Sequence, residues 1–277
     1  MRAINVRALG AMGLLAFVGA PALAGGGGGV PGTITDGTSS YTFLGFDSNG
    51  RAAWNPGGDV SGNQLFQSWW YYRADNQSRE YSFGQGFPNT TQYVGPTATF
   101  TGDESDAPVA AGDAQAGLTW TMTWTVTSGV INTLQSTISV TNTTDDPIVL
   151  NMFHYGDIDL NGNLGDSAIV EDDGTIVISD AGTPGVTIEY TGSSPDAYQI
   201  EVQDDLLEAL NDNAPTDLTN VNNVMTPSDF SAGFQWVDVV LQPGETEEFS
   251  IGFAVIPSPG AGALLGLAGL GALRRRR

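Results

Sequence analysis

The segment from Leu118 to Thr127 constrains the fold most, because apolar and threonine residues alternate along it without a break. The apolar positions are Leu118, Trp120, Met122, Trp124 and Val126, and threonine occupies every position between them. A period of two over ten residues puts the apolar side chains on one face of a β-strand. The segment therefore predicts a strand whose apolar face packs on a core.

Several other stretches carry the same signal. Apolar residues alternate within residues 134–140, 186–190, 198–202, 234–240 and 249–255, and residues 148–155 form a mostly apolar run. The alternating stretches are typical of strands with one buried face, and the apolar run is typical of a strand covered on both faces. Ten or more such strands in one unit predict an all-β fold, either an antiparallel β-sandwich or a large supersandwich.

The segments between these stretches predict turns, loops and one helix. Pro243 and Gly244 occupy the two central positions that suit them in a type II turn. Asp204–Asn211 places three leucines on one side and acids in its first turn, which predicts a short helix. Residues 102–117 and 211–231 lack a periodic pattern, and we expect long loops there.

The chain is strongly acidic, with 31 Asp and Glu residues against nine Lys and Arg residues. Six of the nine basic residues lie in the two ends: Arg2, Arg7, Arg274, Arg275, Arg276 and Arg277. The body therefore carries three arginines against 31 acids, a net charge of 3 − 31 = −28. Such a surface repels nucleic acid and attracts cations. The absence of cysteine excludes disulfides and thiolate metal sites.

The first residues have the three parts of an export signal. Arg2 and Arg7 form a positive beginning, and an apolar run follows them. Ala22 and Ala24 then provide the small residues that a signal peptidase accepts, so cleavage after Ala24 would leave Gly25 as the new N-terminus. We therefore expect the body of the protein to be exported from the cytoplasm.

The last residues also form three parts. They are Pro257, Ser258 and Pro259, an uncharged run of fourteen residues, and the cluster Arg274, Arg275, Arg276 and Arg277. As a helix the run spans about 21 Å, less than the about 30 Å of a bilayer's hydrocarbon core. The order of these parts resembles the PEP-CTERM sorting signal of Gram-negative bacteria, with Pro-Ser-Pro in place of Pro-Glu-Pro. The resemblance implies processing by an exosortase-like enzyme, transient residence in the inner membrane, and delivery to the cell surface or extracellular matrix. A plain membrane tail is the alternative.

These features divide the chain into four parts. Residues 1–24 are expected to be a signal peptide, and residues 25–32 a glycine-rich flexible lead. Residues 33–255 form the predicted β-sandwich domain, and residues 256–277 form the sorting tail with its hydrophobic helix.

Four aromatic residues stand together at Trp69, Trp70, Tyr71 and Tyr72. In a strand they alternate between faces, so one pair points away from the core unless a second layer covers it. Exposed rings can hold the apolar face of a sugar, which makes these four residues candidates for carbohydrate contact. The alternative is that they belong to the core, where aromatic residues are common.

Asp157–Gly162 reads DIDLNG and matches the first six positions of the D-x-[DN]-x-[DN]-G calcium loop. Ala168 stands where an EF-hand has its bidentate glutamate, and no helices flank the segment, so an EF-hand is excluded. The hypothesis that remains is a different calcium loop, with Asp157, Asp159, Asn161, Asn163 and Asp166 as its ligands. Its alternative is an Asp/Asn/Gly turn that leaves a strand.

No nucleophile elbow, phosphate loop or zinc pattern is present in the sequence. The single histidine, His154, lies three residues before Asp157, and its functional interpretation is an acid-base role. A lone histidine at a strand end is more often structural, so we expect no catalytic residues and a protein that is not an enzyme.

The expected function is therefore a structural or adhesive role at the cell surface or in the extracellular matrix. A carbohydrate-binding module of the exopolysaccharide matrix is the first alternative. The second is a mutarotase-like sugar-processing enzyme, which rests on His154. The strands around Thr137 to Asp159 and the hairpin from Gln242 to Val255 loosely resemble the supersandwich of galactose-mutarotase-like domains.

Overall fold

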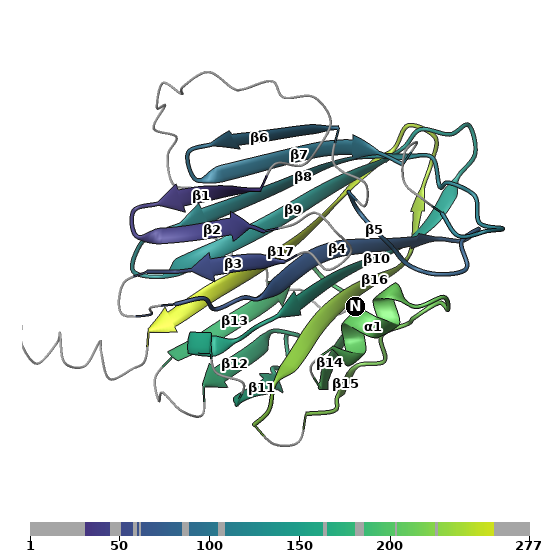
Figure 1. Cartoon of the computed structure of the whole chain (residues 1–277). Helices are drawn as coiled ribbons and strands as arrows, with labels where there is room; N and C mark the ends of the chain where they lie inside the picture. Colours follow the sequence, from purple (N-terminus) through teal and green to yellow (C-terminus); the bar gives the residue numbers. More distant parts are fainter. Residues whose placement is uncertain are drawn as a thin grey trace, which may run out of the picture.

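The computed structural model describes residues 31–44, 51–57, 60, 62–84, 89–104, 109–162, 165–180, 186–202, 204–224 and 227–257. These ranges contain seventeen strands, one α-helix and one 3₁₀ helix, and the strands form a three-, a six- and an eight-stranded sheet (Figure 1). The described part contains no helix that is long and apolar enough to cross a membrane.

The eight-stranded sheet forms one layer of the molecule, and all of its pairings are antiparallel. Its strands, in spatial order, are β11 (Asp166–Val170), β12 (Ile176–Asp180), β13 (Val186–Gly192), β17 (Thr246–Pro257), β9 (Asn132–Asn142), β8 (Leu118–Thr127), β7 (Thr97–Asp103) and β6 (Thr90–Val94). The alternation along β8 is the one that the sequence predicts: its apolar residues are buried, and its threonines lie on the outer face.

The six-stranded sheet forms the opposite layer. Its order is β15 (Val221–Asn222), β14 (Ala197–Val202), β16 (Phe230–Leu241), β10 (Ile148–Asp157), β4 (Gln67–Ala74) and β5 (Tyr81–Ser82), and only the β14–β15 pair is parallel. The three-stranded sheet consists of β1 (Gly32–Asp36), β2 (Ser39–Phe43) and β3 (Ala52–Asn55) and packs on the eight-stranded sheet, where Tyr41 stacks on Trp124 at 5.0 Å.

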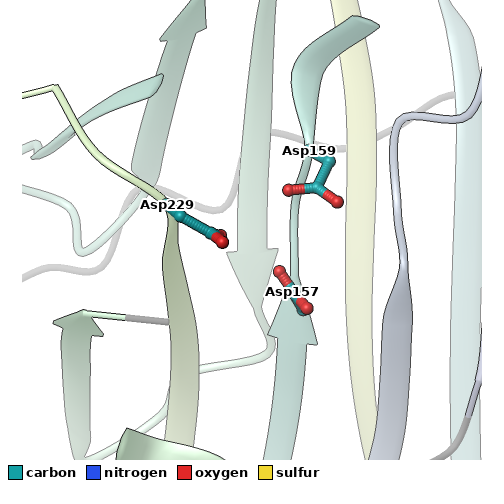
Figure 2. Close-up of side chains that lie close together, drawn as sticks. All are labelled: Asp157, Asp159 and Asp229. Carbon is teal, nitrogen blue, oxygen red and sulfur yellow. The ribbon is translucent and has the colours of Figure 1, made fainter. Parts of the chain in front are cut away.

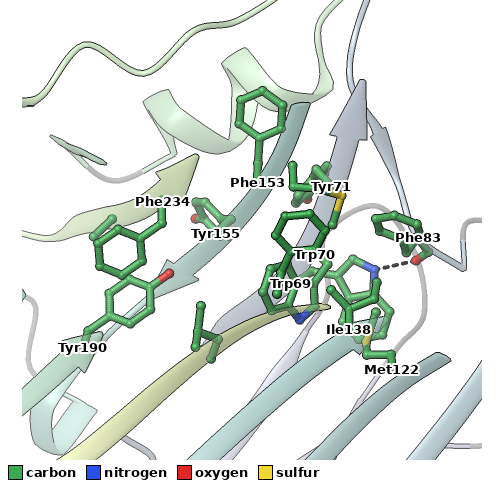
Figure 3. Close-up of a cluster of buried hydrophobic side chains, with 14 of the residues drawn as sticks. Trp69, Trp70, Tyr71, Phe83, Met122, Ile138, Phe153, Tyr155, Tyr190 and Phe234 are labelled. Carbon is green, nitrogen blue, oxygen red and sulfur yellow. Dashed lines mark hydrogen bonds between the residues drawn. The ribbon is translucent and has the colours of Figure 1, made fainter. Parts of the chain in front are cut away.

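The core lies between the two large sheets and is rich in aromatic residues (Figure 3). Trp70 of β4 crosses it and donates from Nε1 to Ser136 Oγ of β9 at 2.8 Å. The helix α1 (Asp205–Asn211) covers the outer face of the six-stranded sheet with its buried leucines, and Leu206 lies beside Gly233 of β16. The sheet carrying β10 is therefore covered on both faces, as its apolar sequence predicts.

The all-β sandwich predicted from the sequence is confirmed, and so are its local elements. Glu245 N donates to Gln242 O at 2.9 Å and Gly244 has φ 76°, which fits the predicted turn. The prediction that residues 211–231 form one long loop is wrong in part. That segment contains β15, and β16 already begins at Phe230, because pairing with β10 and β14 extends the strand beyond its apolar pattern.

Candidate carboxylate site

Three aspartates converge where β10 ends and β16 begins. Asp157 is the last residue of β10, Asp159 follows two residues later, and Asp229 directly precedes β16. Because the two strands pair antiparallel, with Asp157 opposite Ser231, the end of one lies beside the start of the other. One carboxylate oxygen from each aspartate lies within 4.8 Å of the others, and Figure 2 shows the three side chains pointing toward one another. We call these three residues the carboxylate cluster.

Burial and mutual repulsion disfavour the charged forms of these groups. Burial, followed by the nearby charges of Asp159, Asp229 and Asp204, raises the pKa of Asp157 to about 8. Burial and Asp229 raise the pKa of Asp159 to about 6. The pKa of Asp229 is also raised, by burial and then by Asp204. Asp157 is only 7% exposed, and its Oδ1 has no hydrogen-bond partner.

A second ring of polar contacts fixes the loop that follows β10. Asp166 Oδ2 accepts a hydrogen bond from Leu160 N at 2.8 Å, while Asp166 Oδ1 is buried without a partner. Asn161 donates from its backbone N to Gln64 Oε1 and from Nδ2 to Asp180 Oδ2, both at 2.9 Å. Asn161 has φ 57°, a left-handed conformation that asparagine tolerates better than most residues.

The predicted calcium loop is therefore rearranged. Asp157 and Asp159 come together, whereas the amide of Asn161 contacts Asp180, and Asp166 holds the backbone of Leu160. Asn163 lies outside the described residues. Sequence reasoning missed Asp229, which is 70 residues away along the chain from Asp159. The signal that could have found it is antiparallel pairing, since a strand recognised from Phe230 onward would have placed its start beside the end of β10.

His154 lies inside the core. Its Nδ1 is 2.6 Å from Tyr190 Oη, its Nε2 is 3.2 Å from Ser68 Oγ, and its ring packs against Trp70. Burial holds the pKa of His154 well below its usual value. With both ring nitrogens occupied and no exposed surface, this histidine links the two sheets and does not reach a substrate.

The aromatic cluster Trp69, Trp70, Tyr71 and Tyr72 is buried in the same region, so the prediction of a carbohydrate contact there is wrong. Trp70 and Tyr72 face the eight-stranded sheet, and the outer face of β4 is covered as well. Trp69 donates from Nε1 to Phe83 O at 2.6 Å, a bond drawn in Figure 3. A second layer covers each face of the strand, which leaves no ring surface for a sugar.

The residues predicted to guide export and sorting lie almost wholly outside the described residues. This holds for Ala22, Ala24 and Gly25 at the beginning, and for Ser258, Pro259, Arg274, Arg275, Arg276 and Arg277 at the end. Pro257 is described as the last residue of β17.

A polar groove with a volume of about 1570 Å³ is lined by residues from both large sheets. Its lining includes Gln135 and Thr137 of β9, Ser250 of β17, and the half-buried Tyr198 on β14. The turn between β11 and β12 contributes the exposed residues Glu171, Asp172 and Asp173. Hydroxyls, an amide, carboxylates and an aromatic ring therefore meet in one open depression.

Comparison with known proteins establishes a shared architecture. No family profile and no curated protein matches this chain. A bacterial glucoamylase complexed with acarbose superposes with a TM-score of 0.51 at 11% identity, over 90% of this chain and 36% of that chain. A GalM/aldose epimerase homologue from C. elegans superposes with a TM-score of 0.50 at 11% identity, over 83% of this chain and 100% of that chain. The likeness is one of fold.

This likeness corrects the expectation that the protein is not an enzyme. That expectation rested on a β-sandwich without a recognisable catalytic motif, and the same sandwich occurs in a glucoamylase and in an aldose epimerase homologue. Absence of a sequence motif is a weak guide on such a fold, because function depends on a local arrangement of residues that the fold carries.

Proposed function

We propose that this protein is a sugar-processing enzyme that binds its saccharide in the polar groove. The observation that carries the proposal is the extent of the fold likeness to the aldose epimerase homologue, which covers 83% of this chain and all of that one. The glucoamylase, whose described complex contains acarbose, points to the same substrate class over 90% of this chain. Both comparisons support carbohydrate as the substrate.

The groove has the chemistry that a sugar requires. Thr137, Ser250 and Gln135 offer hydroxyl and amide groups to sugar hydroxyls, and Tyr198 offers a ring to the apolar face of a pyranose. The volume of about 1570 Å³ accommodates more than one sugar ring. Because the groove is open to solvent, it can bind the end of a polysaccharide chain or a free sugar.

Catalysis at an anomeric carbon needs one group that removes a proton and one that supplies it. His154 is enclosed in the core, so the carboxylates at the groove take these roles in our proposal. Glu171 and Asp172 lie on the turn that borders the groove, and a pair of carboxyl groups can serve as acid and base in sugar chemistry.

The test is catalysis of sugar interconversion and of glycoside hydrolysis by the purified body of the protein. We expect faster relaxation of freshly dissolved α-glucose or α-galactose in polarimetry, or release of glucose from an oligosaccharide. The double variant Glu171→Gln/Asp172→Asn should lower the rate by about 10²-fold or more, as expected for loss of acid-base groups.

The matched control is Asp145→Asn/Asp146→Asn, which removes the same charge from the exposed turn between β9 and β10. This variant should retain the wild-type rate. Saccharide binding without turnover in any of these assays would instead favour a carbohydrate-binding role in the exopolysaccharide matrix. An equal loss of rate in both double variants would mean that the carboxylates at the groove do not take part in catalysis.

We also propose that the protein acts outside the cytoplasm, at the cell surface or in the extracellular matrix. The support is the order of charged, apolar and small residues up to Ala24, and the three-part tail that begins at Pro257. The intact mass of protein recovered from its native surface should correspond to a chain that begins at Gly25 and lacks the arginine cluster. A mass that includes Arg274 to Arg277 would contradict sorting by cleavage.

A further inference from the structure

The carboxylate cluster concentrates negative charge in a protein with few cations to balance it. Lysine is absent from the chain, and only three arginines lie outside the two ends. Arg73 pairs with Glu80 and Asp217, and Arg79 donates to Asn213. The cluster joins Asp157 and Asp159 to Asp229, which is distant in sequence, so the fold brings the three carboxyl groups together.

Asp157 brings a buried carboxylate oxygen without a hydrogen-bond partner to the cluster. Asp157 is more than nine-tenths buried, its Oδ1 has no hydrogen-bond partner, and its carboxylate points toward Asp159 and Asp229 in Figure 2. Buried polar atoms in native proteins are nearly always satisfied, and a buried charge is normally paired or bound to a metal. A cation suits this oxygen, because the carboxylates of Asp159 and Asp229 lie beside it.

We propose that Asp157, Asp159 and Asp229 bind one calcium ion, which ties the end of β10 to the start of β16. Calcium–oxygen distances are about 2.4 Å, so two oxygens bound to one ion are at most about 4.8 Å apart. The three carboxylate oxygens lie within 4.8 Å of one another, which a single ion satisfies. Waters complete the six to eight oxygens that calcium prefers.

The ligand chemistry separates calcium from other metals. The cluster offers hard carboxylate oxygens, whereas zinc favours sulfur and nitrogen, and this chain has no cysteine and only one histidine. Both nitrogens of that histidine are occupied in the core. Magnesium demands a closer octahedral shell, at about 2.0–2.1 Å, and gives up its waters reluctantly.

Asp166 is a further candidate ligand beside the cluster. It is almost completely buried, and its Oδ1 is a second oxygen without a partner. Its other oxygen holds Leu160 N in the loop between Asp159 and β11. An ion bound here therefore stabilises two strand ends and the loop that follows β10. This role does not depend on the proposed sugar chemistry.

The experiment measures the melting temperature of the full chain with calcium chloride, with magnesium chloride, with sodium chloride of equal ionic strength, and with chelator. At a tenfold excess over the dissociation constant, we expect calcium to raise the melting temperature by about 3 to 6 °C. Isothermal titration with calcium chloride should give a single site, with a dissociation constant of about 10⁻⁴ to 10⁻³ M.

Asp229→Asn is the decisive variant, and Asp145→Asn is its control, since it removes one acid from an exposed turn. In chelator, Asp229→Asn should melt at or above the wild-type temperature, because removing the Asp229 carboxylate relieves repulsion within the cluster. In calcium it should lose most of the increase in melting temperature that wild type and Asp145→Asn retain.

An equal increase in all three proteins, or an equal increase with sodium, would overturn the site. An equal shift with magnesium would overturn the assignment to calcium. Because the readout is melting, loss of sugar turnover cannot be mistaken for either result.

Discussion

His154 illustrates what a single buried polar residue does in this sandwich. It lies on β10 of the six-stranded sheet and contacts Tyr190 on β13 of the eight-stranded sheet and Ser68 on β4. The three residues satisfy one another in a core that is rich in aromatic residues, so the hydrogen bonds specify how the two sheets face each other. The burial of His154 lowers the stability of the folded protein at acidic pH, because the histidine of the unfolded chain binds a proton more readily than the buried one.

The pH dependence of His154 follows from its depressed pKa. The stability that it contributes is complete above its usual pKa of about 6.5 and is lost as pH falls, because protons bind preferentially to the unfolded chain. We expect the stability difference between wild type and His154→Gln to shrink by about 1 kcal/mol between pH 7 and pH 5.5. Urea unfolding of both proteins at the two pH values measures it.

Comparison with the variant cancels the carboxylates, whose raised pKa values act in the opposite sense. A difference that stays constant with pH would mean that the pKa of His154 in the folded protein equals that in the unfolded chain.

At the scale of elements, Arg73 connects β4 to the segment after α1. Its guanidinium contacts Glu80, the carbonyl oxygen of Thr216 at 2.7 Å and Asp217 at 2.6 Å. Glu80 has a fully buried side chain, and Thr216 N also donates to it at 2.8 Å. Burial raises the pKa of Glu80 even though Arg73 opposes that shift. The pair thus joins the edge of the six-stranded sheet to the segment that covers it.

Removing Arg73 should be costly, because Glu80 would stay buried without its cation. We expect Arg73→Ala to lower the free energy of unfolding at pH 7 by about 3 kcal/mol. Arg79→Ala is the matched control, since Arg79 donates to Asn213 at an exposed site and its loss should cost at most about 1 kcal/mol. Both values come from urea unfolding. Similar losses of unfolding free energy in the two variants would show that the buried pair contributes no more to stability than the exposed contact of Arg79.

At the scale of the whole molecule, charge dominates. The body has a net charge of 3 − 31 = −28 from its arginine and acidic residues, and repulsion among like charges opposes a compact state. The chain has no disulfides, so the burial of apolar side chains in its core must offset this repulsion. Ions in solution reduce the repulsion by screening it.

Stability should therefore rise with ionic strength. The screening length falls from about 30 Å at 0.01 M to about 10 Å at 0.1 M, so most of the increase in melting temperature should come at low salt. A series of sodium chloride concentrations in the presence of chelator measures this effect without calcium. A flat or falling trend would mean that the acids are already paired in the folded protein.

The sequence alone determined the architecture, because strand periodicity is local. Along β8 the alternation of apolar residues and threonine specified which face is buried, and the apolar run of β10 specified a strand covered on both sides. The turn before β17 followed from Pro243 and Gly244. These properties depend on residues a few positions apart, which a sequence displays directly.

Only the tertiary structure decided which residues form a site. Trp69 to Tyr72 became core because a second layer covers the outer face of β4, and no local pattern announces that layer. Asp157 and Asp159 were visible as a motif, but their partner is Asp229 in place of Asn161, because the pairing of β10 with β16 brings Asp229 close. Asn161 contacts Asp180 through the pairing of β11 with β12. Contacts between distant segments depend on sheet order and register, which local periodicity does not encode.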